Sequence, residues 1–261
     1  MQQTARGNTC AIAVMAKAPR SGFVKTRLCP PLQPDEAAAL GGAFLRDTTE
    51  NVAAAGHSVP IDGFVAFAPA EHEDLFEGLI AERTGLLLAD GLTGFDCALY
   101  QGVKGLGLAL LHAMVSLFAR GYPAVCVLNA DGPTLPTSYL IDAARMLRSD
   151  AATDAAVMGP STDGGYYLLG ARSDVPVQHL LTAIDWSTDR VASQTRDRAA
   201  ASRIPIRELP AWYDVDDMDS LLQLMDDTIF AGRTDGRYDA AATTALLNTL
   251  DLRSRLETTR L

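Results

Sequence analysis

Short, uninterrupted apolar segments alternate with longer amphipathic segments along most of this chain, and that alternation restricts the folds open to it. The run at 10–16, CAIAVMA, contains no polar residue, which is typical of a strand buried on both faces. Residues 35–55 instead repeat apolar side chains at helical spacing, after a Pro-Asp-Glu start at 34–36. Strand and helix in alternation predict an α/β protein, with a mostly parallel sheet covered by helices on both faces.

The same patterns predict the remaining elements and a simple organisation. Further strands are expected at 61–68, 86–89, 124–130, 155–158, 166–169 and 204–208. Further helices are expected at 71–83, 103–120, 137–148, 188–201 and 217–230, the third of them capped by Thr137. We expect one domain at 1–232 and a polar helical tail at 233–261, which either packs as a final helix, frays, or contacts a second copy in a homodimer.

Composition limits the class of partner. Acidic residues number 32 and basic residues 22, and the resulting net charge of −10 argues against general nucleic-acid binding, which requires an excess of Lys and Arg. The four cysteines are widely scattered, which is typical of a reducing compartment, and no C-x-x-C pair signals a zinc knuckle or a redox site. The apolar run at 10–16 is too short to span a membrane, and no signal-peptidase site follows it. A cytoplasmic protein without a membrane span is therefore expected.

A cluster of basic residues directly follows the first predicted strand. Lys17, Arg20, Lys25 and Arg27 lie where ligands bind in open α/β sheets, and together they would neutralise a di- or triphosphate. Gly22 lets the backbone approach such a ligand. The alternative is a solvated surface loop, and the segment is neither a P-loop nor a G-x-G-x-x-G turn. The residues predicted to bind a nucleotide are Lys17, Gly22, Lys25, Thr26 and Arg27.

Three carboxylates are candidate metal ligands. Asp131 ends an apolar strand, a position from which a carboxylate can hold Mg²⁺ or Mn²⁺ against nucleotide phosphates. Asp214 and Asp216 alternate as strand-end residues do, and either would complete that site. Turn formation at Asp131 and helix capping at the later pair are equally ordinary explanations.

A glycine pair supplies the candidate acceptor pocket. Gly164 and Gly165 leave room for a bound group, and Tyr166 opens the strand that follows them. Asp163 would contact an acceptor hydroxyl or act as a base, so that Lys25, Asp131 and Asp163 are the predicted catalytic residues. The competing interpretation is a hairpin whose turn is Asp-Gly.

Other chemistries find little support. The four histidines are isolated and no G-x-S-x-G turn occurs. Gly105 and Gly107 precede apolar helix positions, so helix packing explains them better than phosphate binding.

Taken together and in this order, the motifs resemble those of a bacterial family of unknown function with the GT-A glycosyltransferase fold. The family, related to nucleotide-diphospho-sugar transferases, is often labelled radical-SAM/selenodomain-associated transferase. Its A-K-x-P-x-x-G-x-x-K-T-R-L matches 16–28, and its Asp-x-Pro-x-Leu-Pro matches 131–136. Its G-P-x-x-D-G-G-Y-Y-L-[IL]-G matches 159–170, and W-S-T and D-V-D follow at 186–188 and 214–216. One departure is at 105–110, where the family has a polar G-D-L-G-E-R-M segment and this chain has GLGLAL.

The resemblance implies a Rossmann-like sheet that binds a nucleotide over its first half and a small acceptor over its second, with a divalent cation at Asp131. Two reactions are compatible with such a site. Glycosyl transfer expels a nucleoside diphosphate from a sugar donor, whereas nucleotidyl transfer joins a nucleoside triphosphate to a phosphorylated acceptor and releases pyrophosphate. The apolar segment at 105–110 keeps open a third alternative, a nucleotide-binding protein without catalysis.

Overall fold

The computed structural model describes residues 7–90, 102–149, 154–230, 236–250, 252 and 255. Seven strands within these residues form one sheet in the order β3-β2-β1-β4-β6-β5-β7. Their bounds are β1 Cys10–Met15, β2 Ile61–Phe67, β3 Gly85–Leu88, β4 Ala124–Asn129, β5 Ala156–Pro160, β6 Tyr166–Arg172 and β7 Ile206–Glu208. Only β6 runs antiparallel to its neighbours, so the prediction of a mostly parallel, Rossmann-like sheet is confirmed.

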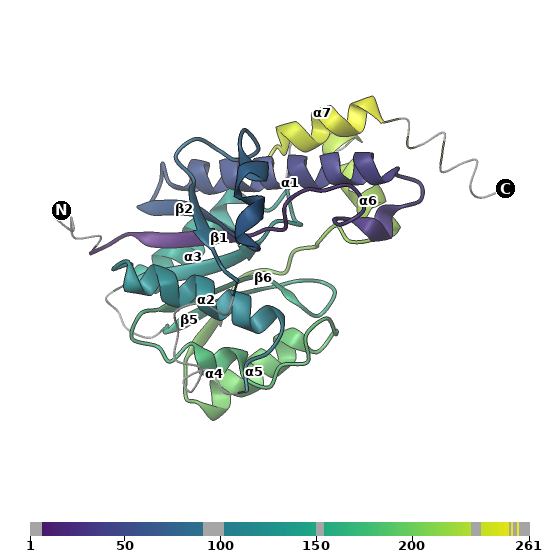
Figure 1. Cartoon of the computed structure of the whole chain (residues 1–261). Coiled ribbons are helices and arrows are strands. Elements are labelled where there is room, and N and C mark those ends of the chain that lie inside the picture. The colour runs from purple at the N-terminus through teal and green to yellow at the C-terminus, as the bar shows by residue number, and fades with distance from the viewer. Residues whose placement is uncertain are drawn as a thin grey trace.

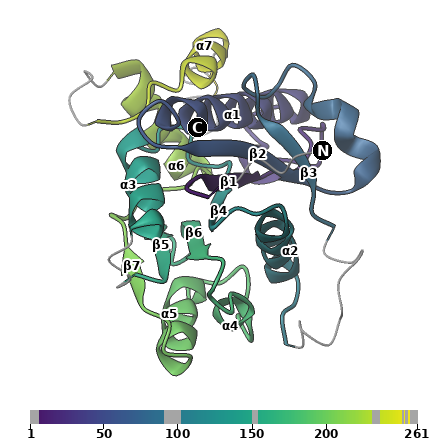
Figure 2. The ribbon, with the colours of Figure 1, turned by 90° about the vertical axis from the view of Figure 1, so that its left-hand side faces the viewer.

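Helices cover both faces of the sheet (Figures 1 and 2). One face carries α1 (Pro34–Ala55) and α3 (Thr137–Arg148), and the other carries α2 (Leu106–Ala119), α4 (Gln178–Leu181) and α5 (Val191–Ala201). Two further helices, α6 (Met218–Met225) and α7 (Ala241–Thr249), pack near α1. None of the helices in the described part of the chain is both long enough and apolar enough to cross a membrane.

The apolar run that forms β1 is buried on both sides. Cys10, Ile12 and Val14 join the core under α1 and α3. Ala11 and Ala13 join the core under α2, α4 and α5. A central strand with a helix layer on each face has no exposed position, which explains the absence of polar residues there.

Some predicted boundaries are wrong, and the backbone gives the reason. The helix expected at 71–83 is a 3-10 segment, Ala70–Phe76, because the chain turns at Gly78 with a φ of +71°. The helices expected from 103 and 188 begin later, after Gly105 and Ser187 adopt positive φ. The short helix α4 was not predicted, and the helix expected at 217–230 becomes π-helical at Asp226–Phe230.

Thr137 does not cap α3. It is the first helical residue, and Pro136 occupies the cap position. Its hydroxyl instead donates to Oδ1 of Asn51 at 2.6 Å, joining α3 to α1. The predicted tail at 233–261 lies partly outside the described residues, and its described part contains α7, which packs along α1.

A buried carboxylate in α1 caps α7 from a distance. Asp47 is fully buried and accepts hydrogen bonds from the backbone N–H groups of Ala242 (2.9 Å) and Thr243 (2.7 Å). We expect Asp47→Ala to lower the free energy of unfolding by about 2 kcal/mol, because two buried donors lose their acceptor. Urea unfolding monitored by circular dichroism measures this loss. Asp35→Ala, at an exposed position of the same helix, is the control, and equal midpoints for the two variants would contradict the capping role.

Candidate functional site

A cavity of about 790 Å³ opens at the carboxyl ends of the parallel strands. Strands β1 and β4 are neighbours in the sheet, but the chain leaves β1 for β2 on one side and returns through β4 on the other. Loops that leave neighbouring strands in opposite directions form a crevice, which is where open α/β sheets bind ligands. The ends of β1, β2 and β4 line the cavity, together with the start of α2 and the start of β6.

The basic loop after β1 supplies one wall. Lys17, Lys25, Thr26 and Arg27 all line the cavity. Arg20 does not, because its guanidinium lies over the ring of Phe23 at 4.4 Å and contacts His72. Gly22 also lies outside the cavity lining, although its φ of +77° requires glycine-like freedom and turns the loop back.

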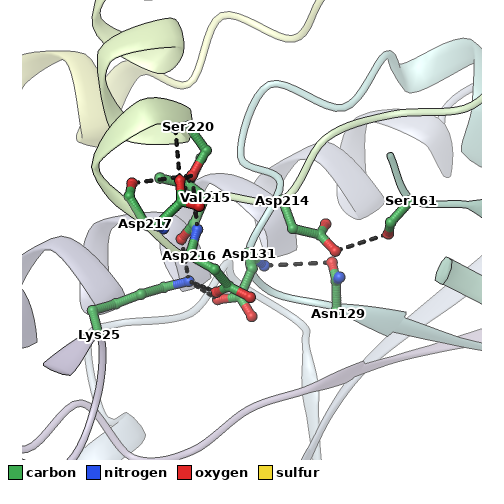
Figure 3. Close-up of polar contacts among 9 residues, drawn as sticks. All are labelled: Lys25, Asn129, Asp131, Ser161, Asp214, Val215, Asp216, Asp217 and Ser220. Atoms are coloured by element: carbon green, nitrogen blue, oxygen red, sulfur yellow. Dashed lines mark hydrogen bonds and ion pairs between the residues drawn. The ribbon is translucent and has the colours of Figure 1, made fainter. Parts of the chain in front are cut away.

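Lys25 lies at the centre of the site (Figure 3). Its ammonium forms an ion pair with Asp131, lies 3.1 Å from Oδ1 of Asp216, and donates to the carbonyl of Val215 at 2.7 Å. Asp131 follows β4, whereas Val215 and Asp216 precede α6, so the lysine joins three segments that are far apart in sequence. The backbone amide of Val215 donates to the carbonyl of Asp131 at 2.9 Å and fixes the two acidic segments against each other.

Lys25 does not point into solvent, as it would in a solvated surface loop. Its side chain is only 8% exposed, whereas those of Asp131 and Asp216 are 39% and 47% exposed. Burial opposes the positive charge, but the two carboxylates outweigh that effect and raise the pKa of Lys25 above its usual value. The ammonium therefore stays charged at neutral pH.

Asp214 is separated from the other two carboxylates. It points toward Ser161, whose hydroxyl donates to its Oδ2 at 2.8 Å, and not toward Lys25 (Figure 3). Its Oδ1 is buried without a hydrogen-bond partner, and it is not among the residues that line the cavity. Burial raises the pKa of Asp214 to about 7. Of the two acids expected to complete the site with Asp131, Asp216 therefore lies beside it and Asp214 does not, because 213–216 is irregular and its alternate side chains do not share a direction.

The raised pKa of Asp214 predicts a pH-dependent stability. Between about pH 4 and pH 7 the folded protein keeps a proton that the unfolded chain has lost, so this residue makes the protein less stable as the pH rises. Asp214→Asn removes the dependence, so we expect the variant to gain stability over wild type progressively from pH 4 to pH 7. Urea unfolding of both proteins at several pH values tests this, and a constant difference would contradict it.

The residues present suit a divalent cation held by two carboxylates. Asp131 and Asp216 converge on one cationic group, and each retains an exposed part of its carboxylate. No cluster of three or more His, Cys, Asp or Glu that could hold a metal ion exists within the described ranges. Mg²⁺ is often bound by one or two carboxylates, with substrate phosphates and water as the other ligands. The pair fits a metal of that kind, and does not form a complete protein cage.

The predicted acceptor residues are only partly in the cavity. Tyr166 lines it, whereas Asp163, Gly164 and Gly165 do not. Oδ1 of Asp163 accepts from the backbone N–H of Gly165 at 2.9 Å, closing the turn between β5 and β6. The hairpin interpretation of this motif is therefore correct for the backbone.

An apolar wall of the cavity was not predicted. Phe23 is 65% exposed and Leu106 is 53% exposed, and both line the cavity, together with Leu110. Gly107 lies against the indole of Trp186, where an added Cβ would approach ring atoms to 2.8 Å. That contact is the helix packing predicted for the glycines at 105 and 107. The sequence signal for this wall was the apolar segment at 105–110, which contains Leu106 and Leu110 and was interpreted as helix packing.

Comparisons with known proteins identify the family and the fold. The model of a family described as "Uncharacterized protein conserved in bacteria (DUF2064)" matches residues 51–188. A solved protein from Desulfovibrio desulfuricans G20, provisionally named a nucleotide-diphospho-sugar transferase, is 28% identical with a TM-score of 0.73, over 93% of this chain and 95% of that one. No curated protein matches the chain.

Two more distant structures share the fold. A nucleotidyl transferase from Methanothermobacter thermautotroptrophicus is 16% identical with a TM-score of 0.52, over 85% of this chain and 98% of its own. A cytidylyltransferase from Leptospira borgpetersenii is 8% identical with a TM-score of 0.50, over 94% of this chain and 95% of its own. The resemblance to an uncharacterised family with a nucleotide-diphospho-sugar transferase fold is confirmed.

Proposed function

The chain belongs to the bacterial family DUF2064, and from its cavity we propose that it is a divalent-metal-dependent transferase acting on a nucleotide-sugar donor. One observation carries the proposal. The cations Lys17, Lys25 and Arg27 and the carboxylate Asp131 line the same cavity, at the switch point between β1 and β4. A cationic wall facing a carboxylate pair is suited to a polyphosphate whose charge is shared between side chains and a metal.

The basic wall would bind the phosphates. Arg27 offers a planar fork for two phosphate oxygens, whereas Lys17 and Lys25 offer point charges. Once in contact with the bound phosphates, these groups would stabilise the charge that develops on the departing phosphate without further movement, which is usually the largest single contribution to catalysis.

Asp131 and Asp216 would hold Mg²⁺ or Mn²⁺. When bound, the metal adds positive charge at the phosphate oxygens. Val215 holds Asp131 in place through the backbone hydrogen bond between them, so that the two carboxylates stay on one side of the cavity.

The apolar wall would receive the rest of the substrates. Phe23 and Leu106 present exposed apolar surface suited to the face of a base or a sugar. Tyr166, at the start of β6, lines the cavity and would contact the acceptor, whereas the carboxylate of Asp163 accepts a hydrogen bond within its own turn.

Nucleotidyl transfer is the second candidate, and the number of cations favours it. Three basic side chains line the cavity beside a carboxylate pair that fits a metal, and a triphosphate has more charge to neutralise than a sugar diphosphate. Release of pyrophosphate from a nucleoside triphosphate and a phosphorylated acceptor would identify this reaction.

A single panel of incubations separates the candidates. The protein is incubated with UDP-, GDP- and CDP-sugars or with GTP, CTP and UTP, each with Mg²⁺ and with phosphorylated and unphosphorylated acceptors. Nucleoside diphosphate release supports the leading proposal, and pyrophosphate release overturns it in favour of the second. Calorimetry follows nucleotide binding in parallel. Binding that is independent of Mg²⁺, without turnover, would instead identify a non-catalytic nucleotide-binding protein.

A further inference from the structure

The ammonium of Lys25 occupies a position lined by oxygen atoms. Its three partners are the carboxylates of Asp131 and Asp216 and the carbonyl of Val215. Two carboxylates and a backbone carbonyl are also the oxygen donors that Mg²⁺, Mn²⁺ and Ca²⁺ prefer. A side-chain cation therefore stands where a divalent cation would find its protein ligands.

The position is built and is not a chance surface contact. Lys25 has a left-handed backbone, with a φ of +50°, which directs its chain inward from the basic loop. Its ammonium lies 5.3 Å from the centre of the Phe44 ring, so the side chain crosses the apolar surface of α1 before it reaches the acids. The lysine is 8% exposed, whereas the two carboxylates are reachable from the cavity.

We propose that Lys25 competes with the divalent cation for Asp131 and Asp216, so that the metal binds tightly only after the phosphates of a nucleotide draw the ammonium away. Only the displacement of the ammonium by nucleotide phosphates rests on the proposed function. The competition between Lys25 and a metal ion concerns this chain's own residues and does not depend on it.

Charge balance favours exchange over joint occupancy. The ammonium of Lys25 neutralises one of the two carboxylate charges, so that the site has a net charge of only about −1. A divalent cation added beside the retained ammonium would place three positive charges against two negative ones at short range, where they repel strongly in a partly buried site. A polyphosphate removes the conflict, because it offers the lysine a new partner and the metal further oxygen ligands. Metal and nucleotide then strengthen each other's binding by the same factor.

Titration with Mn²⁺ alone tests the competition, with free Mn²⁺ followed by electron paramagnetic resonance. The wild type is compared with Lys25→Met, which keeps the length of the side chain and removes its charge. We expect Lys25→Met to bind one Mn²⁺ about tenfold or more tightly than wild type in the absence of nucleotide. The added binding should disappear in Lys25→Met with Asp131→Asn. Circular dichroism confirms folding, and Lys25→Gln replaces the methionine variant should that fail to fold.

Lys17→Met is the matched control, because Lys17 is an exposed lysine that lines the same cavity. It removes the same charge at a distance from the carboxylates, so we expect its effect on Mn²⁺ affinity to stay below about threefold. Equal affinity of wild type and Lys25→Met, an equal gain in both lysine variants, or no Mn²⁺ binding by either protein at millimolar metal would overturn the competition. Failure of the proposed function is a different result, because it appears as absent nucleotide binding while the nucleotide-free Mn²⁺ gain persists.

Discussion

Replacing Asp131 by alanine is expected to reduce the rate of transfer by about a hundredfold or more, the range found when a group that stabilises transition-state charge is removed. Asp131 lies two residues after the end of β4, and its carboxylate forms the ion pair with Lys25 and lines the cavity beside the basic loop, as Asp216 also does. Its loss removes one of the two candidate metal ligands and one of the two carboxylates that contact Lys25. Nucleoside diphosphate or pyrophosphate release, at saturating donor and metal, measures the effect.

Stability is expected to change far less than activity in that variant. The carboxylate of Asp131 is 39% exposed, and without it the buried ammonium of Lys25 still has Asp216 and the carbonyl of Val215 as partners, so no buried charge is left unpaired. Asp142→Ala is the matched control, because Asp142 is a half-exposed aspartate of α3 that forms an ion pair with Arg145 of the same helix. If Asp131→Ala binds nucleotide as tightly as wild type, both with and without Mg²⁺, then Asp131 is neither a metal ligand nor a catalytic residue.

The sequence predicts the sheet and the location of the site for a simple physical reason. A strand buried on both faces leaves an apolar run such as 10–16, and the residues after it must lie at the carboxyl edge of the sheet. Lys17 and Asp131 could therefore be placed at one edge before any coordinates were known. Both line the cavity.

The partners of Lys25 could not be predicted in this way. Asp216 is 191 residues away, and its position depends on how the segment before α6 packs on α1. Likewise, Asp214 and Asp216 share a face only if their segment is an extended strand. The backbone there is irregular, so Asp214 turns to Ser161. Such contacts depend on how loops pack. Loops, unlike helices and strands, have no hydrophobic periodicity in the sequence from which their packing could be predicted.

The predicted helix boundaries were wrong for a related reason. The pattern at 71–83 has apolar residues at helical spacing, but Gly78 adopts a positive φ in the middle of it. The first turn of α2 is delayed because Gly105 has a φ of +56° and a ψ of −130°, and the glycine is followed by a second one that accommodates Trp186. Tertiary contacts decide these positions, and local propensity is too weak to oppose them.

The glycine pair of the β5–β6 turn leads to the largest expected effect on stability. Gly164 has a φ of +91°, and a Cβ added there would lie 2.1 Å from the carbonyl oxygen of Asp189. The clash is with backbone, which cannot swing aside as a side chain can, and the carbonyl of Gly164 also accepts from the amide of Ala192 at 2.9 Å. The turn and the segment that leads into α5 are therefore packed so closely that only glycine fits at position 164. We expect Gly164→Ala to lower the free energy of unfolding by about 3 kcal/mol, the combined cost of overpacking and of a strained backbone.

Gly165→Ala separates this packing role from the acceptor role first expected of both glycines. At Gly165 the nearest atom to an added Cβ is Oδ1 of Asp163, 3.2 Å away on a side chain that can rotate, so we expect a loss below about 1 kcal/mol. Urea midpoints of the two variants measure the difference. If Gly164→Ala instead unfolds with the wild type and raises only the KM for the acceptor, the glycine serves the ligand. A large loss of stability in Gly164→Ala alone would mean that position 164 is glycine because the segment before α5 packs directly against it. The tyrosine of the D-G-G-Y motif, Tyr166, would then be its one residue with a role in the cavity.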